Sequence, residues 1–103
     1  MAYRLLVSEK AENQIDRDIK YIVEALKNPS AAKGLLQDIE NAYLDLERMP
    51  EAFSLCNDSY LSAKGYRKLS LSKHDYLFVY RIEGNIVFLL GFFHMSENYA
   101  KKL

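Results

Sequence analysis

Two successive segments repeat their apolar residues with the 3.6-residue period of an α-helix, and this pattern restricts the possible folds more than any other feature. In residues 9–27 and again in residues 31–48, apolar positions recur every three or four residues. Ser8 precedes the first segment as a candidate N-cap, and Ser30 is the expected cap of the second. Because so few residues around Pro29 separate the two segments, we expect the helices to pack as an antiparallel hairpin.

Segments with strand character lie before and after the helical pair. The last of them is apolar on both faces, which predicts a central strand, and Gly84-Asn85 before it is typical of a tight hairpin turn. The expected strands are residues 3–7, 66–71, 76–82 and 86–93. This order predicts one α+β domain over residues 1–103, in which an N-terminal strand and an α-helical hairpin precede a three-stranded antiparallel meander, with the helices covering one face of the sheet.

Residues 51–64, between the helices and the meander, have no regular apolar period. Asn57, Asp58 and Ser59 are typical of a loop, and Phe53 and Tyr60 are candidate anchors for it. A loop of this length in a compact domain is often a binding or active-site element.

The charge of the chain is zero overall but unevenly distributed. Residues 1–60 hold seven Lys/Arg and eleven Asp/Glu (7 − 11 = −4), whereas residues 61–103 hold seven and three (7 − 3 = +4). We expect an anionic partner such as RNA or an acidic peptide to bind the basic half, although ordinary surface variation would also produce such a bias. The opposite signs of the two halves also permit a homodimer.

Several classes of protein are disfavoured by what the sequence lacks. No apolar run approaches the roughly 20 residues that cross a bilayer, and no signal peptide is evident. The lone Cys56 cannot form an internal disulfide, so we expect a cytoplasmic protein. There is no zinc-binding or phosphate-binding motif, and we expect no metal and no cofactor.

Arg67 and Arg81 are the most informative charged residues. A three-residue turn over residues 73–75 would place them directly opposite each other, where an anion between the two guanidinium groups would relieve their repulsion. We favour this register. A two-residue turn would instead put Arg67 opposite Tyr80 and send the arginines to different faces, and each could then pair with an acid such as Glu83.

His94 and Tyr99 follow the last strand and complete the set of candidate reactive groups. A histidine has a pKa near neutrality and can act as an acid or a base, whereas many at strand ends only hydrogen-bond the backbone. Tyr99 could donate a proton or stack on a base, or could simply pack. The alternating aromatic residues at 76, 78 and 80 could stack bases, but sheet packing is the better interpretation.

The order of elements and several short motifs resemble the RelE/ParE superfamily, whose members are toxins of type II toxin–antitoxin systems, some of them called plasmid stabilisation proteins. The likeness spans essentially the whole chain. It rests on Ser8-Glu9-Lys10-Ala11, Met49-Pro50, Gly65-Tyr66-Arg67-Lys68-Leu69, Phe78-Val79-Tyr80-Arg81-Ile82 and the apolar strand that ends in His94.

The resemblance implies a toxin neutralised by a co-encoded antitoxin, with either of two activities. RelE-like members are mRNA interferases that cut mRNA on the ribosome by attack of the 2′-hydroxyl on the adjacent phosphate. On that branch Arg67, Arg81, His94 and Tyr99 are the candidate catalytic residues, and the residues expected to contact nucleic acid are Lys64, Arg67, Lys68, Lys73 and Arg81.

ParE-like members, by contrast, inhibit DNA gyrase without cutting nucleic acid. The present chain has Ser70 and Phe93 where RelE has basic residues, which favours this branch. A third interpretation is a non-toxic relic that only binds its antitoxin.

Overall fold

The fold is α+β, as expected, in a computed structural model that describes residues 2–103. Strand β1 (Arg4–Val7) leads into helix α1 (Glu9–Lys20), which continues as a π-helical turn, η1 (Tyr21–Ala25). Helix α2 (Pro29–Arg48) follows and then three short elements and the meander strands. These are η2 (Pro50–Ala52), α3 (Ser59–Ala63), β2 (Arg67–Ser70), β3 (Tyr76–Glu83), β4 (Ile86–His94) and η3 (Tyr99–Lys101).

The four strands form one sheet in the order β1-β4-β3-β2. Strand β4 is central, as its apolar character on both faces predicts, because it pairs in parallel with β1 and antiparallel with β3. The expected turn at Gly84-Asn85 joins β3 to β4, and Gly84 has a φ of 61°, a left-handed conformation that glycine adopts without a Cβ clash.

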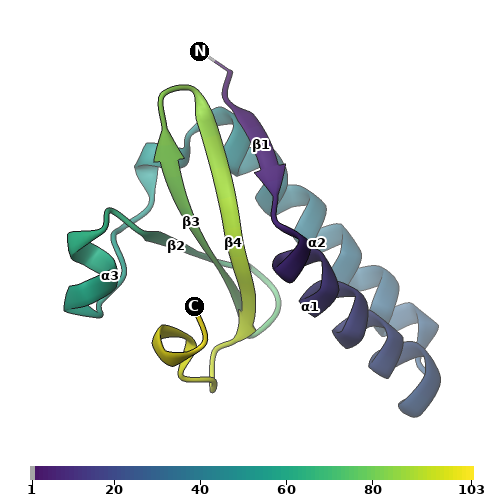
Figure 1. The fold of residues 1–103 in the computed structure, drawn as a ribbon. Coiled ribbons are helices and arrows are strands. Elements are labelled where there is room, and N and C mark those ends of the chain that lie inside the picture. Colours follow the sequence, from purple (N-terminus) through teal and green to yellow (C-terminus); the bar gives the residue numbers. More distant parts are fainter. Residues whose placement is uncertain (1) are drawn as a thin grey trace.

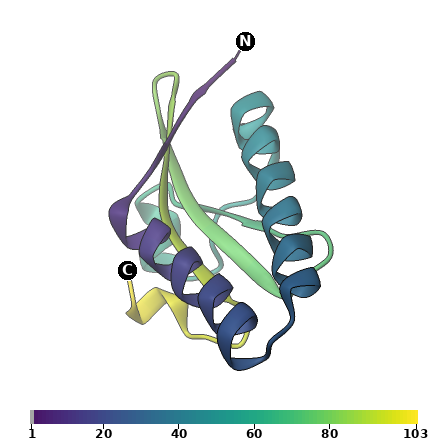
Figure 2. The ribbon, with the colours of Figure 1, turned by 90° about the vertical axis from the view of Figure 1, so that its right-hand side faces the viewer.

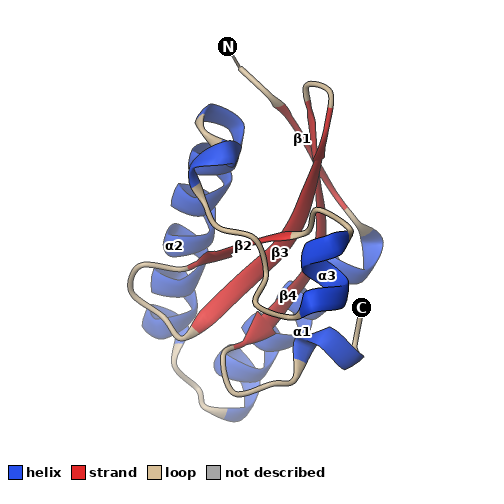
Figure 3. Cartoon of the chain, turned by 90° about the vertical axis from the view of Figure 1, so that its left-hand side faces the viewer, coloured by secondary structure: helices blue, strands red, loops and turns tan. Residues whose placement is uncertain are grey.

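Each face of the sheet has its own cover and its own core (Figure 1). Helices α1 and α2 cover one face as an antiparallel hairpin, which Figure 2 shows in front of the sheet; we call this the hairpin face. Helix α3 and the C-terminal tail lie on the other, the α3 face (Figure 3). The hairpin-face core contains Leu35, Leu46, Phe78, Tyr80 and Leu89, whereas the α3-face core consists of Cys56, Leu61, Leu77, Val79 and Phe93.

The helical hairpin begins and ends differently from the sequence prediction. Ser8 is the N-cap of α1, as expected, and its Oγ accepts a hydrogen bond of 3.1 Å from the Ala11 amide. The expected cap Ser30 is wrong: Asn28 caps α2, because Pro29 can occupy the first helical position, where an amide would have no partner. The α-helix expected up to residue 27 widens after Lys20, and Leu26, expected on the apolar stripe, is 56% exposed.

Residues 51–64 are not an irregular loop, which corrects a second expectation. Pro50–Ala52 forms a 3-10 turn, and Ser59–Ala63 forms α3, whose N-cap is Asp58. The Asp58 carboxylate accepts a 3.0 Å hydrogen bond from the Leu61 amide, so a residue that suggested a loop begins a helix. Leu61 is 2% exposed and anchors α3 to the sheet. No helix within residues 2–103 is long and apolar enough to cross a membrane.

The favoured register between β2 and β3 is wrong. Arg67 pairs with Tyr80, not with Arg81, and Leu71 closes the ladder by donating its amide to the Tyr76 carbonyl at 2.9 Å. Four residues, 72–75, therefore form the turn instead of three. A shift of one residue reverses every side chain of a strand, so the arginines lie on opposite faces of the sheet.

Tyr80 joins the sheet to the segment that follows α2. Its side chain is fully buried, and its hydroxyl donates a 2.6 Å hydrogen bond to the Pro50 carbonyl. Burial raises the pKa of Tyr80, so the hydroxyl keeps the proton that it donates. The aromatic residues of β3 that face the hairpin are thus core residues, which confirms sheet packing over base stacking.

We expect Tyr80→Phe to lower the free energy of unfolding by about 1 kcal/mol, because the buried Pro50 carbonyl loses its donor while the ring still fills the core. Urea unfolding followed by circular dichroism measures this change. Tyr43→Phe is the matched control: Tyr43 lies in the same core, half-buried, and is expected to change stability by much less. Equal losses in the two variants would contradict a specific role for the Tyr80 hydroxyl.

Candidate functional site

The basic residues of the C-terminal half are divided between the two faces of the sheet and its end loop. Arg67 opens β2 on the hairpin face, because it pairs with Tyr80, a residue of that core. Lys68 pairs with Val79 and therefore shares the α3 face with it. Arg81 follows two residues after Val79 on β3 and lies on the same face. The two arginines that were expected to bind one anion together thus lie on opposite faces of the sheet.

Arg67 is held by its own chain. Its guanidinium donates to the carbonyl oxygens of Phe53 at 2.5 Å and Glu51 at 3.4 Å, and an isolated bridge joins it to Leu55. These contacts tie the segment after α2 to the edge of the sheet. Both bonds come from Nη1, so this end of the guanidinium serves the attachment.

Arg81 is engaged on the other face. It forms an ion pair with Glu83, the alternative that the sequence left open, and its guanidinium carbon lies 4.3 Å from the centre of the Phe88 ring. A guanidinium over an aromatic face is stabilised by the quadrupole of the ring. Arg81 is about one third exposed, so its outer edge still faces solvent.

His94 ends β4 at the far end of the sheet from Arg81. It pairs with Tyr76 in the register, whereas Arg81 pairs with Phe88. Tyr76 and Arg81 are five positions apart on β3, a distance of about 16 Å. The ring of His94 meets Tyr76 edge-on, with 5.1 Å between centroids. Its Nδ1 accepts from the Ser96 amide at 3.1 Å, and its backbone amide donates to Glu97 at 2.8 Å.

Tyr99 and Tyr76, the residue whose ring His94 contacts, lie on opposite faces of the sheet. Its ring is 6.0 Å from that of Phe93 in the α3-face core, whereas Tyr76 stacks on Phe92 in the hairpin-face core. Burial raises the pKa of Tyr99, with further contributions from Cys56 and Asp58. A phenol whose pKa is raised gives up its proton less readily. Burial likewise raises the pKa of the Cys56 thiol.

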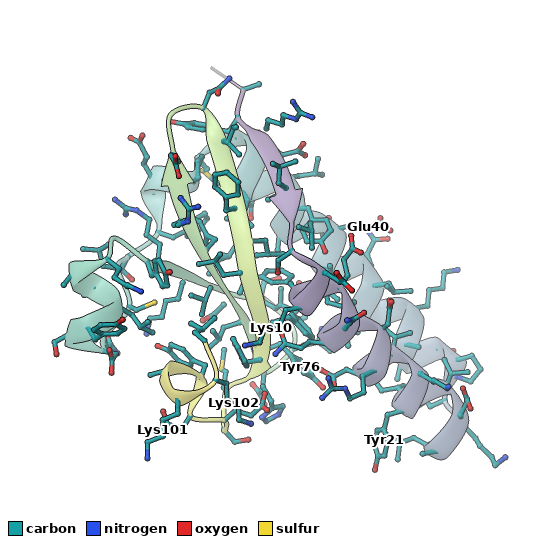
Figure 4. All side chains as sticks on the ribbon, in the orientation of Figure 1. Lys10, Tyr21, Glu40, Tyr76, Lys101 and Lys102 are labelled. Carbon is teal, nitrogen blue, oxygen red and sulfur yellow. The ribbon has the colours of Figure 1, made fainter. Side chains whose placement is uncertain are left out.

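A pocket on the α3 face brings together residues that the sequence did not group. It has a volume of about 240 Å³, and helix α3, strand β4, the tail and the start of α1 line it. Leu61, Leu90 and Leu103 supply aliphatic surface, while Lys10 and Lys64 bring ammonium groups. Lys10 donates to the Lys102 carbonyl, and Figure 4 shows Lys10 beside the tail that carries Lys102, with Tyr21 far away at the tip of the hairpin.

Lys73 lies apart from both faces, in the turn between β2 and β3. Its backbone amide donates at 2.9 Å to Asp38, a carboxylate that is 3% exposed on α2. Ser72 Oγ and His74 Nδ1 bind the same carboxylate at 3.0 and 2.8 Å. The sequence analysis did not identify Asp38. Its position beside Leu35 and Ile39 on the apolar stripe of α2 could have indicated a buried carboxylate. No group of metal-binding side chains occurs among the described residues.

Comparison of the chain with known proteins identifies its family. The family model described as the ParE toxin of the type II toxin–antitoxin system, parDE, matches residues 5–99. A comparison with curated proteins finds no significant match. Among solved structures, the chromosomal ParDE system of P. aeruginosa superposes with a TM-score of 0.75 at 20% identity, covering 92% of this chain and 98% of that chain.

Two further structures share the fold. The toxin–antitoxin complex RelBE2 of Mycobacterium tuberculosis gives a TM-score of 0.60 at 18% identity, over 91% of this chain and 99% of that one. A double arginine-to-alanine mutant of the E. coli toxin RelE in the free state gives 0.63 at 17% identity, over 99% and 93%. Since the family model matches residues 5–99 of 103, the chain belongs to the ParE family of toxins of type II toxin–antitoxin systems, within the RelE/ParE superfamily.

Proposed function

We propose that a co-encoded antitoxin neutralises this toxin and that the free toxin inhibits DNA gyrase by binding it, without cutting RNA. The observation that carries this proposal is the dispersal of the candidate catalytic residues. Arg67 and Arg81 bind groups of their own chain on opposite faces, and His94 lies at the other end of the sheet. Attack by a 2′-hydroxyl needs a base, an acid and cations around one phosphate.

The family supports the same branch. The matching family model describes a ParE toxin, and the P. aeruginosa structure is a ParDE system. The solved relatives that include an antitoxin support a protein partner for this chain as well. Exposed apolar side chains on the hairpin, among them Leu36 and Leu44 on α2, offer surface for an amphipathic partner helix.

A supercoiling assay with purified gyrase tests the proposal. We expect the free toxin to block supercoiling, and His94→Gln to block it equally well within about twofold, because a mechanism based on binding needs no proton transfer at residue 94. His94 is exposed at the strand end, so the variant should fold. Circular dichroism of both proteins is the control for folding.

Primer extension on mRNA from translating ribosomes provides the opposing result. Cleavage by the wild type that His94→Gln reduces by about a hundredfold would overturn the proposal and establish the nuclease branch. The candidate catalytic residues Arg67, Arg81 and Tyr99 would then be tested in the same way. Normal growth of cells in which the folded toxin accumulates without its antitoxin would show instead that the chain is a relic.

A further inference from the structure

The Lys64 pocket, the pocket on the α3 face described above, has an aliphatic floor and a charged rim. Leu61 is nearly inaccessible to solvent at 2%, and Leu90 and Leu103 extend the apolar surface toward the opening. Leu103 is 40% exposed even though it lines the pocket. Such a floor gains free energy by taking an aliphatic group out of water.

The rim carries a cation that lies over two aromatic rings. The ammonium group of Lys64 lies 4.8 Å from the centre of the Tyr60 ring and 5.6 Å from that of Tyr66. A hydrogen bond with Tyr60, together with the nearby phenols, raises the pKa of Lys64 and keeps it charged. Within residues 2–103, no carboxylate forms an ion pair with Lys64 or with Lys10 across the pocket.

The same face continues the positive charge beyond the pocket. Lys68 projects from β2 on the α3 face, next to the core that supports α3. Arg81 lies on the same face but is paired with Glu83, so Lys68 is the cation that an extended anionic partner meets after Lys64. A carboxylate attached to an aliphatic group matches the pocket best, because it meets both the ammonium rim and the apolar floor.

Two features favour a polypeptide over a nucleic acid or a small molecule. Lys64 lies over one face of each of the Tyr60 and Tyr66 rings, so a base would have to displace its ammonium group to stack there. Tyr60 is 66% exposed, and together with Leu103 it extends the apolar surface outside the pocket. A small molecule would leave this surface in water, whereas a chain crossing the pocket would cover it.

We infer that the Lys64 pocket receives an aliphatic side chain of the antitoxin, with an adjacent Asp or Glu of the same segment paired to Lys64. This inference rests on the proposed function, because it assigns the antitoxin to a particular surface of the toxin. It places an anchor on the α3 face, distinct from the apolar surface of the hairpin.

The test uses the whole toxin and a short labelled peptide of alternating glutamate and leucine, measured by fluorescence polarisation and by amide chemical shifts. We expect the peptide to shift the amides of Lys64, Leu90 and Leu103, and Lys64→Glu to weaken binding by about tenfold. Lys33→Glu makes the same charge change on exposed α2 and should leave the affinity unchanged. A peptide with lysine in place of glutamate should not bind.

Three results would overturn the inference. They are equal affinity of the Lys64→Glu variant and the wild type, amide shifts that avoid the pocket, and tighter Lys64-dependent binding of a single-stranded RNA than of the peptide. Leu103→Ala provides a second variant that does not reverse a charge, and it should also weaken binding because it removes part of the floor. Its amide spectrum reports whether the fold is kept.

Growth and supercoiling assays separate this inference from the proposed function. If the peptide binds in the pocket but the toxin does not inhibit gyrase, the pocket inference stands and gyrase is rejected as the target. If the toxin inhibits gyrase but the peptide does not bind in the pocket, the pocket inference is wrong and the proposed function stands.

Discussion

Asp38→Ala is expected to lower the free energy of unfolding by about 3 kcal/mol. The carboxylate is 3% exposed on α2 and accepts hydrogen bonds from Ser72 Oγ, the Lys73 amide and His74 Nδ1. Removing it leaves three groups of the turn between β2 and β3 without their acceptor. Urea unfolding at neutral pH measures the loss, and Glu40→Gln on the exposed side of α2 is the control, with little expected effect.

The pH dependence of stability provides a sharper test of the same contact. Burial raises the pKa of Asp38, but the hydrogen bonds from His74, Lys73 and Ser72 outweigh it and hold the pKa below 3.8, its ordinary value. A carboxyl whose pKa is lower in the folded state contributes stability above its unfolded pKa and loses it as the pH falls through the folded one. Stability should therefore decline below about pH 4.

The Asp38→Asn variant separates the contribution of this carboxyl group to the pH dependence of stability from the contributions of the other carboxyl groups. Asparagine keeps the shape of the side chain but does not titrate, so the variant should be less stable at neutral pH and should lose less than the wild type on acidification. The difference in the free energy of unfolding between the wild type and Asp38→Asn should become smaller as the pH falls. A constant difference from neutral pH to pH 3 would show that the Asp38 charge does not stabilise the turn.

The Asp38 contact also explains why the register of the sheet could not be predicted locally. The sequence of residues 72–75 permits turns of several lengths. The four-residue turn is held by a carboxylate from α2, more than thirty residues earlier in the chain. One residue more in the turn places Arg67 and Arg81 on opposite faces. The register therefore separates the two arginines, whereas His94 and Tyr99 lie apart from them for reasons that do not involve this turn.

Other features were predictable because their causes are local. The apolar period of α2 marked its buried residues, since Leu35, Ile39 and Leu46 all lie in the core. The central position of β4 followed from apolar residues on both faces. Helix α3 was missed because five residues are too few to show a period, and only the cap at Asp58 signalled it. The Lys64 pocket combines α1, α3, β4 and the tail, which only the tertiary structure brings together.

Gly91→Ala is expected to destabilise the protein by about 2 kcal/mol. Gly91 pairs with Val79 where the register between β3 and β4 shifts, and a Cβ at this position would overlap the ring of Phe93, 2.7 Å from Cζ and closer still to Cε2. Phe93 is 1% exposed in the α3-face core, so its ring cannot move without disturbing Leu61 and its other neighbours. Thermal and urea unfolding both measure the loss.

The chain contains its own matched control for this substitution. Gly34 lies within α2, and a Cβ there would have no atom within 4 Å. Gly34→Ala should therefore stabilise the protein by roughly 0.5–1 kcal/mol, since alanine loses less backbone entropy than glycine in a helix. The same chemical change thus has opposite expected signs at two positions. A stabilising Gly91→Ala would mean that the ring of Phe93 does not lie over the strand. The same added Cβ would be 3.3 Å from Leu103, so this result would also contradict the position of Leu103 at the edge of the Lys64 pocket.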